Sequence, residues 1–233
     1  MTIASPAPRF HALPGRLAMP ALMILLVQIA LYLWMAPRGF EFTDEAYYFH
    51  NFVHWREFTG TVTFFGAYFE WPFRAMNNSI AGIRILSLLL VLVSSAILMH
   101  HVLRFSLRGQ YFTGGAPKGI VSSHWWYLVA PMASAMLYFG YFSTLRAPSY
   151  NLLSLCCMTL GTACLLRALE PGTAGRPLRG MALLNGIAVG ACFLSKATTA
   201  VAMVLLHVMF FIAVNRDWSF KRLAEVFLFA SAG

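Results

Sequence analysis

Long apolar runs separated by short basic segments make up most of the chain. Four runs are about as long as a helix that crosses the hydrocarbon core of a bilayer, roughly 20 residues: 17–36, 80–102, 125–142 and 149–168. A fifth run, 181–214, would reach roughly 50 Å as one helix, which is too long for a single crossing. We expect it to divide at Ser195-Lys196 into spans 181–195 and 198–214.

This pattern predicts an all-α integral membrane protein with about six transmembrane helices. A last apolar run, 223–233, resembles the start of a seventh span, but eleven residues cannot cross a bilayer. We therefore expect either a truncated product or the front part of a longer protein.

The distribution of charge predicts which side of the membrane each loop faces. With the basic tail 1–16 inside, the inner segments hold eleven Lys and Arg against three acidic residues, and the outer segments hold six against five. Positive residues favour the cytoplasmic side. We expect a multi-pass protein of the inner (plasma) membrane with a cytoplasmic N-terminus and a large outer loop, 37–79, on the periplasmic side.

Composition excludes two broad classes of protein. The chain is 59% hydrophobic and 11% charged, whereas a soluble domain carries about a quarter charged residues. The net charge of +9 lies in short segments between apolar runs, with no basic stripe or reading motif, so we expect no nucleic-acid partner. The lipid bilayer is the partner that the composition predicts.

The stretch EFTDEAYYFHNFVHWREF, residues 41–58, opens the outer loop. Thr43 can cap a helix whose first turn holds Asp44 and Glu45, where carboxylates suit the positive end of the helix dipole. Tyr48, Phe52 and Trp55 fall on one side of it. This spacing predicts an amphipathic helix that lies flat on the bilayer surface with its carboxylates at the loop end.

A divalent metal is the only cofactor that the sequence suggests. His50 and His54, at i and i+4 near Asp44, could ligate one. Two histidines in an aromatic interfacial helix more often hold no metal, so they are weak candidates. Nothing in the sequence resembles a Gly-rich phosphate loop or a nucleotide motif.

The second half of the outer loop is rich in Phe, Tyr and Trp and is broken by Gly60, Gly66 and Pro72. Aromatic residues next to spans usually form an interfacial belt. A wall that binds sugar or lipid is the alternative.

Charged residues that could carry chemistry gather on the predicted outer side. Arg84 stands about one turn inside the second span, where its long side chain could extend to the interface. Lys196, between two short spans, needs an anion or must extend to the interface, and a lipid phosphate is a natural partner.

Four segments, all on the outer side and in this order, resemble the C-type glycosyltransferases. The branch they resemble most is the bacterial protein mannosyltransferase and lipid A aminoarabinose transferase type, which depends on polyprenyl-phosphate sugars. The segments are Asp44-Glu45, Glu70-Trp71-Pro72, Pro148-Ser149-Tyr150-Asn151 and Gly190-Ala191-Cys192-Phe193-Leu194-Ser195-Lys196.

The resemblance implies transfer of a sugar from a polyprenyl-phosphate carrier to an acceptor glycan, lipid or protein at the outer face. Asp44 would be the catalytic base on the acceptor hydroxyl, and Glu45 would support it. Substrate-binding residues would hold the lipid phosphate and shape the site: Lys196, Arg74, Arg84, Arg146, Tyr150, Asn151 and Glu70.

Two other functions fit the same residues. A non-catalytic membrane protein that binds or flips polyprenyl-linked lipids would use the cations and aromatics without Asp44. A truncated pseudoenzyme would keep the motifs without catalysis.

Overall fold

The structure is a computed structural model of the whole chain, and six stretches of it are described here. They are residues 15–39, 44–57, 63–112, 126–141, 147–169 and 176–214. Within them all regular structure is helical, with no strand. This confirms the expected all-α class.

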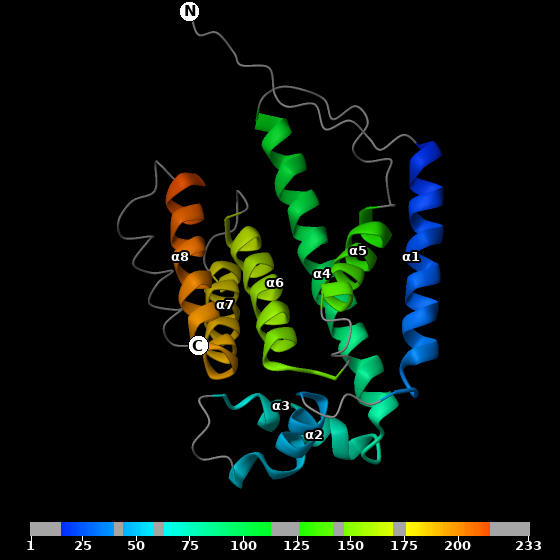
Figure 1. The fold of residues 1–233 in the computed structure, drawn as a ribbon. Helices are drawn as coiled ribbons and strands as arrows, with labels where there is room; N and C mark the ends of the chain where they lie inside the picture. The colour runs from blue at the N-terminus through cyan, green and yellow to red at the C-terminus, as the bar shows by residue number, and fades with distance from the viewer. Residues whose placement is uncertain are drawn as a thin grey trace, which may run out of the picture.

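Six longer helices run side by side and form a bundle (Figure 1). They are α1 (Gly15–Met35), α4 (Ile80–Phe112), α5 (Trp126–Tyr141), α6 (Tyr150–Leu169), α7 (Arg176–Ser195) and α8 (Ala197–Val214). Three short helices lie across one end of this bundle: α2 (Asp44–His54), the 3₁₀ helix η1 (Trp55–Glu57) and α3 (Phe65–Ala75).

The six bundle helices occupy the six apolar segments that the sequence analysis predicted as spans. The predicted turn at Ser195-Lys196 is confirmed, because α7 ends at Ser195 and α8 begins at Ala197. Helix α4 continues to Phe112, ten residues beyond the predicted end of its span. The run 223–233 lies outside the described residues.

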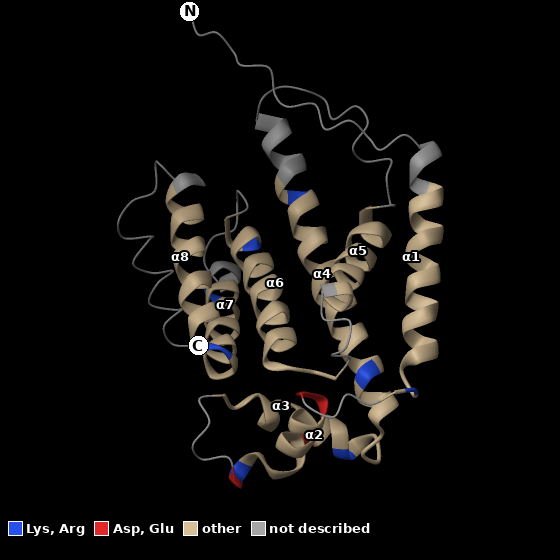
Figure 2. Cartoon of the chain, viewed as in Figure 1, with Lys and Arg blue, Asp and Glu red and all other residues tan. Residues whose placement is uncertain are grey.

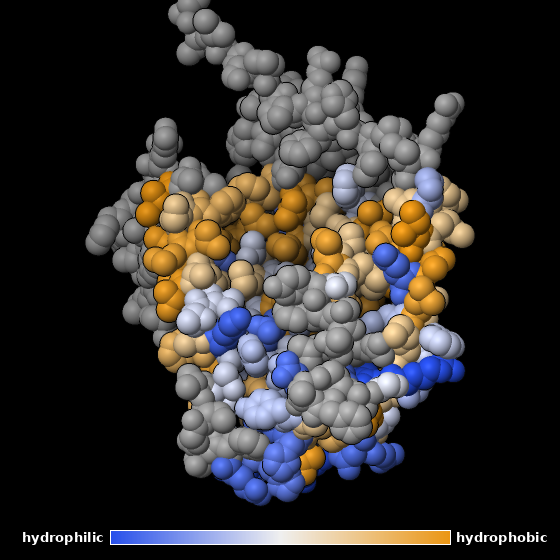
Figure 3. Space-filling view, in the orientation of Figure 1, coloured by the Kyte–Doolittle hydropathy of each residue, from blue (hydrophilic) through white to orange (hydrophobic). Residues whose placement is uncertain are grey.

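Two described helices are long and apolar enough to cross a membrane, Ile80–Phe105 within α4 and Tyr150–Leu169. Shorter apolar helices are Met19–Met35, Arg179–Ser195 and Ala197–Ile212. Hydrophobic residues form a band across the bundle, whereas hydrophilic residues gather at the end that holds α2 and α3 (Figure 3).

Most of the described part of the aromatic second half of the loop is a helix, so the expectation that Gly66 and Pro72 break this segment is wrong, while Gly60 lies outside the described residues. Both residues lie inside α3. Phe65, Phe69 and Phe73 recur along one side of α3 and are buried, each within 6.0 Å of a Phe52 ring of α2, measured between ring centroids. Such packing outweighs the weak helix propensity of Gly and Pro.

Gly66 lets α2 and α3 approach each other closely. A Cβ atom at position 66 would stand 1.8 Å from Asn51 Oδ1 and 2.6 Å from the Asn51 backbone oxygen. The side chain of Asn51 could move aside, but its backbone carbonyl belongs to α2 and could not move without shifting that helix. Only glycine fits this crossing.

Replacing Gly66 by alanine should therefore destabilise the protein. Overpacking of a tight contact costs about 1–3 kcal/mol, which exceeds the gain of about 1 kcal/mol from better helix propensity. Thermal unfolding in detergent would measure the change. Gly180→Ala is the matched control, since nothing lies within 4 Å of a Cβ there, and it should keep or raise the unfolding temperature. Equal behaviour of the two variants would contradict the close crossing of α2 and α3.

Candidate functional site

A buried ion pair joins α2 to α4. The Arg84 side chain donates from Nη2 to Glu45 Oε2 at 2.5 Å and from Nε to Glu45 Oε1 at 3.1 Å. Both side chains are only 1% exposed. A two-pronged contact between guanidinium and carboxylate is the strong geometry for such a pair.

The remaining hydrogen-bonding capacity of the pair is used by the backbone. Arg84 donates to the carbonyl oxygens of Ala36 at 2.7 Å, Gly39 at 2.9 Å and Arg38 at 3.3 Å, all just after α1. Glu45 Oε1 also accepts the backbone N–H of Ala147 at 3.0 Å. The pair therefore ties together the end of α1, the start of α2, the first turns of α4 and the segment before α6.

This geometry corrects two expectations. Arg84 does not extend to the membrane interface, because it is buried and its donors are directed at Glu45 and three carbonyl groups. A lipid phosphate would have to displace these partners, so the geometry opposes the predicted phosphate-binding role. Glu45 does not lie at an open loop end beside Asp44. It is the buried counter-ion of Arg84.

Asp44, the neighbour of Glu45, is exposed at the first turn of α2. It interacts electrostatically with Tyr48 one turn along the helix, and Tyr48 is hydrogen-bonded to Tyr150 of α6. The two tyrosine rings lie 6.2 Å apart between centroids, edge to face. Burial, together with Tyr150 and Asp44, raises the pKa of Tyr48 well above its ordinary value. Tyr48 is therefore a neutral hydrogen-bonding group beside the Asp44 carboxylate.

Lys196 lies between α7 and α8 and points to the start of α6. Its Nζ donates to Asn151 Oδ1 at 2.8 Å and stands 5.5 Å from the centre of the Tyr150 ring. Neither partner neutralises the ammonium charge. Tyr150 thus contacts both the Lys196 ammonium and Tyr48, and Tyr48 in turn interacts with Asp44.

These contacts bring residues from distant parts of the chain to one end of the bundle. Figure 2 shows acidic residues on the side of α2 that is nearest the bundle and a basic residue near the end of α7. The Phe64 N–H also donates to the Leu194 carbonyl oxygen at 2.8 Å, which fixes the start of α3 beneath the end of α7. We call Asp44, Tyr48, Tyr150, Asn151 and Lys196 the outer-end cluster, after the side of the membrane that the sequence predicts for this end.

Other predicted site residues lie elsewhere or are occupied. Glu70 and Arg74 form an ion pair of 2.9 Å one turn apart on α3, and Trp55 Nε1 donates to Glu70 at 2.6 Å. Their predicted contact with substrate stays a prediction. Arg146 lies outside the described residues.

The rings of the two histidines of α2 lie against each other, tilted by 38°. Their ring centroids are 4.8 Å apart, and His54 Nδ1 lies 3.0 Å from Glu57 Oε1. Within the described residues, no group of three side chains is placed to hold a metal ion.

Sequence reasoning missed Tyr48 as a member of the cluster. Its spacing from Asp44, one helical turn, was the available signal, but the same spacing also fits a side chain that merely packs.

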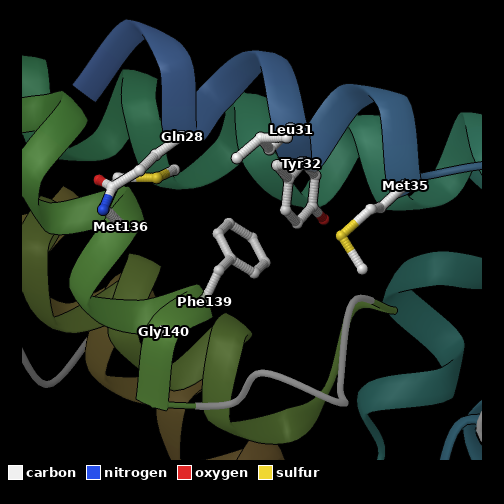
Figure 4. A pocket seen from close by; sticks show the side chains of 7 residues that line it. All are labelled: Gln28, Leu31, Tyr32, Met35, Met136, Phe139 and Gly140. Atoms are coloured by element: carbon white, nitrogen blue, oxygen red, sulfur yellow. The ribbon is translucent and has the colours of Figure 1, made fainter. Parts of the chain in front are cut away.

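The sequence also showed no sign of a pocket of about 310 Å³ between α1 and α5 (Figure 4). Its lining carries no charged side chain and comprises Gln28, Leu31, Tyr32, Met35, Met136, Phe139 and Gly140.

No protein-family model, curated protein or solved structure matches the chain.

Arg84→Met should lower stability strongly, because it leaves the Glu45 carboxylate buried without its counter-ion. Removing one partner of a buried pair costs about 3–5 kcal/mol, whereas removing both often costs far less. We expect the double variant Arg84→Met with Glu45→Gln to recover part of the loss in thermal unfolding.

The matched control is Arg74→Ala, whose side chain is 61% exposed and should cost no more than about 1 kcal/mol. A loss for Arg84→Met as small as that control, or purely additive losses in the double variant, would contradict the buried pair.

Proposed function

We propose that this protein is a membrane glycosyltransferase that moves a sugar from a polyprenyl-phosphate carrier to an acceptor at the outer face of the membrane. The observation that carries the proposal is the outer-end cluster. Asp44 supplies a carboxylate, and Lys196 supplies an ammonium group whose contacts with Asn151 and Tyr150 leave its charge in place. Tyr48 and Tyr150 link the two.

The proposal includes a membrane orientation. The six bundle helices cross the bilayer, the N-terminus is cytoplasmic, and α2 and α3 lie on the periplasmic side. Support comes from the hydrophobic band over the bundle and from the excess of Lys and Arg in the opposite set of loops (Figure 3).

In the proposed reaction the Asp44 carboxylate accepts the proton of the acceptor hydroxyl. The hydroxyl oxygen bonds to the anomeric carbon of the sugar, and the bond from that carbon to the carrier phosphate breaks. The electron pair leaves with the phosphate, whose growing negative charge Lys196 stabilises. Asn151 and Tyr150 hold the ammonium in place.

Asp44→Asn should abolish sugar transfer in the protein as it exists in its native membrane. Loss of a general base lowers a rate by about 10²–10⁴. The measurement is transfer from radiolabelled polyprenyl-phosphate sugars by membranes that contain the variant. Glu57→Gln, an exposed carboxylate of η1, is the control and should keep normal activity. Transfer by Asp44→Asn within a few-fold of the parent would contradict the assignment.

Lys196→Met should weaken binding of the carrier, because it removes the ammonium that meets the phosphate. Binding of a short polyprenyl phosphate to detergent-purified protein would measure it. We expect the affinity to fall by at least tenfold and its salt dependence to diminish. Arg56→Met removes an exposed cation of η1 and should leave the affinity unchanged. Unchanged affinity in Lys196→Met would reject this phosphate site.

A second function, binding or flipping of polyprenyl lipids without catalysis, is favoured by one observation. Lys196 and its two partners could hold a lipid phosphate without any help from Asp44. Carrier binding that survives in Asp44→Asn, together with no sugar transfer by the parent protein, would support this function over the transferase.

A further inference from the structure

Helix α3 has an exposed aromatic side. Phe64, at its N-terminal boundary, Tyr68 and Trp71 recur at i, i+4 and i+7 and so share one side of the helix. They are 49%, 37% and 77% exposed. The opposite side carries the phenylalanines buried under α2. We call Phe64, Tyr68 and Trp71 the aromatic stripe.

Two observations place the N-terminal half of the stripe beside the bundle. The backbone of Phe64 is hydrogen-bonded to Leu194 at the end of α7. Tyr68 interacts electrostatically with Cys157 in the second turn of α6, and burial raises its pKa. In Figure 1 α3 lies beneath the ends of these helices.

The stripe begins beside exposed apolar residues of the bundle. Phe193 and Leu194, in the last turn of α7, are 55% and 43% exposed. Because α3 begins against Leu194, its aromatic side chains start where the exposed apolar surface of α7 ends. The charged pair Glu70 and Arg74 follows a different line along α3, with Glu70 about 100° and Arg74 about 60° round the helix from Trp71.

We propose that the aromatic stripe anchors α3 in the boundary between headgroups and acyl chains of the lipid bilayer. This inference rests on the proposed membrane placement of the bundle. Tyr and Trp have apolar rings with one polar tip, and such side chains concentrate at that depth. The helix whose aromatic side chains enter the membrane surface is then α3, whereas the sequence pattern predicted this role for α2.

The anchor would keep the outer-end cluster at the height of the lipid phosphates. Since α3 is bonded to Leu194, two residues before Lys196, insertion of the stripe fixes the depth of the ammonium group. A carrier lipid could then reach Lys196 without leaving the bilayer.

Site-directed spin labelling of the full chain in lipid nanodiscs tests the anchor. Nitroxides at positions 68 and 71 are compared with one at Glu57, whose side chain is 73% exposed. Cys156, Cys157, Cys164 and Cys192 are first replaced by alanine or serine. We expect the nitroxides at positions 68 and 71 to collide more often with oxygen, which dissolves in lipid, than with a water-soluble nickel chelate. The nitroxide at position 57 should show the reverse.

A fourth label, at Leu205 on the exposed side of α8, separates the two possible failures. If positions 205, 68 and 71 all favour oxygen, the anchor is supported. If 205 favours oxygen while 68 and 71 favour nickel, the bundle is in the membrane but the stripe faces water, as a docking surface for a soluble glycan would, and the anchor is rejected. If 205 also favours nickel, the membrane placement and the anchor both fail.

An unlabelled comparison guards against disturbance by the nitroxides. Brominated lipids should quench less of the total tryptophan fluorescence after Trp71→Phe than in the parent chain. An unchanged quenched fraction would overturn the proposal.

Discussion

The burial of Arg84 is the constraint on which the end of the bundle that holds α2 and α3 depends. A guanidinium cut off from water needs an anion and several further acceptors, and the cost of leaving it unpaired is several kcal/mol. Glu45 and the three carbonyl groups after α1 supply them. Because these partners come from separate segments, the chain cannot satisfy Arg84 without docking α2 against the bundle and fixing the course of the segment that follows α1.

The docking of α2 through Glu45 also determines the direction in which the Asp44 side chain points. Neighbouring residues on a helix point about 100° apart, so burying the second carboxylate turns the first away from the ion pair. Asp44 is thereby left exposed next to Tyr48 and Tyr150, while Lys196 approaches Tyr150 from the α7–α8 turn. The two neighbouring acidic residues therefore differ: Glu45 holds the structure together, and Asp44 is exposed.

The sequence predicted the helices well and their contacts poorly, for physical reasons. The lengths of the apolar runs predicted the bundle helices, and the excess length of the run 181–214 predicted the break at Ser195-Lys196. Helix α3 was not predicted, because Gly66 and Pro72 have low helix propensity and usually end a helix. Its stability comes instead from aromatic packing against α2, which the local sequence does not reveal. The partner of Arg84 lies 39 residues away and that of Lys196 lies 45 away, and no local pattern selects such pairs.

The most direct measurement is an experimental structure of the protein in lipid nanodiscs with a short polyprenyl phosphate. The account predicts the phosphate within hydrogen-bond distance of Lys196 Nζ, with Asp44 on the same side of the bilayer and Glu45 still on Arg84. A phosphate bound far from Lys196, or α2 on the opposite side of the bilayer from Lys196, would contradict it.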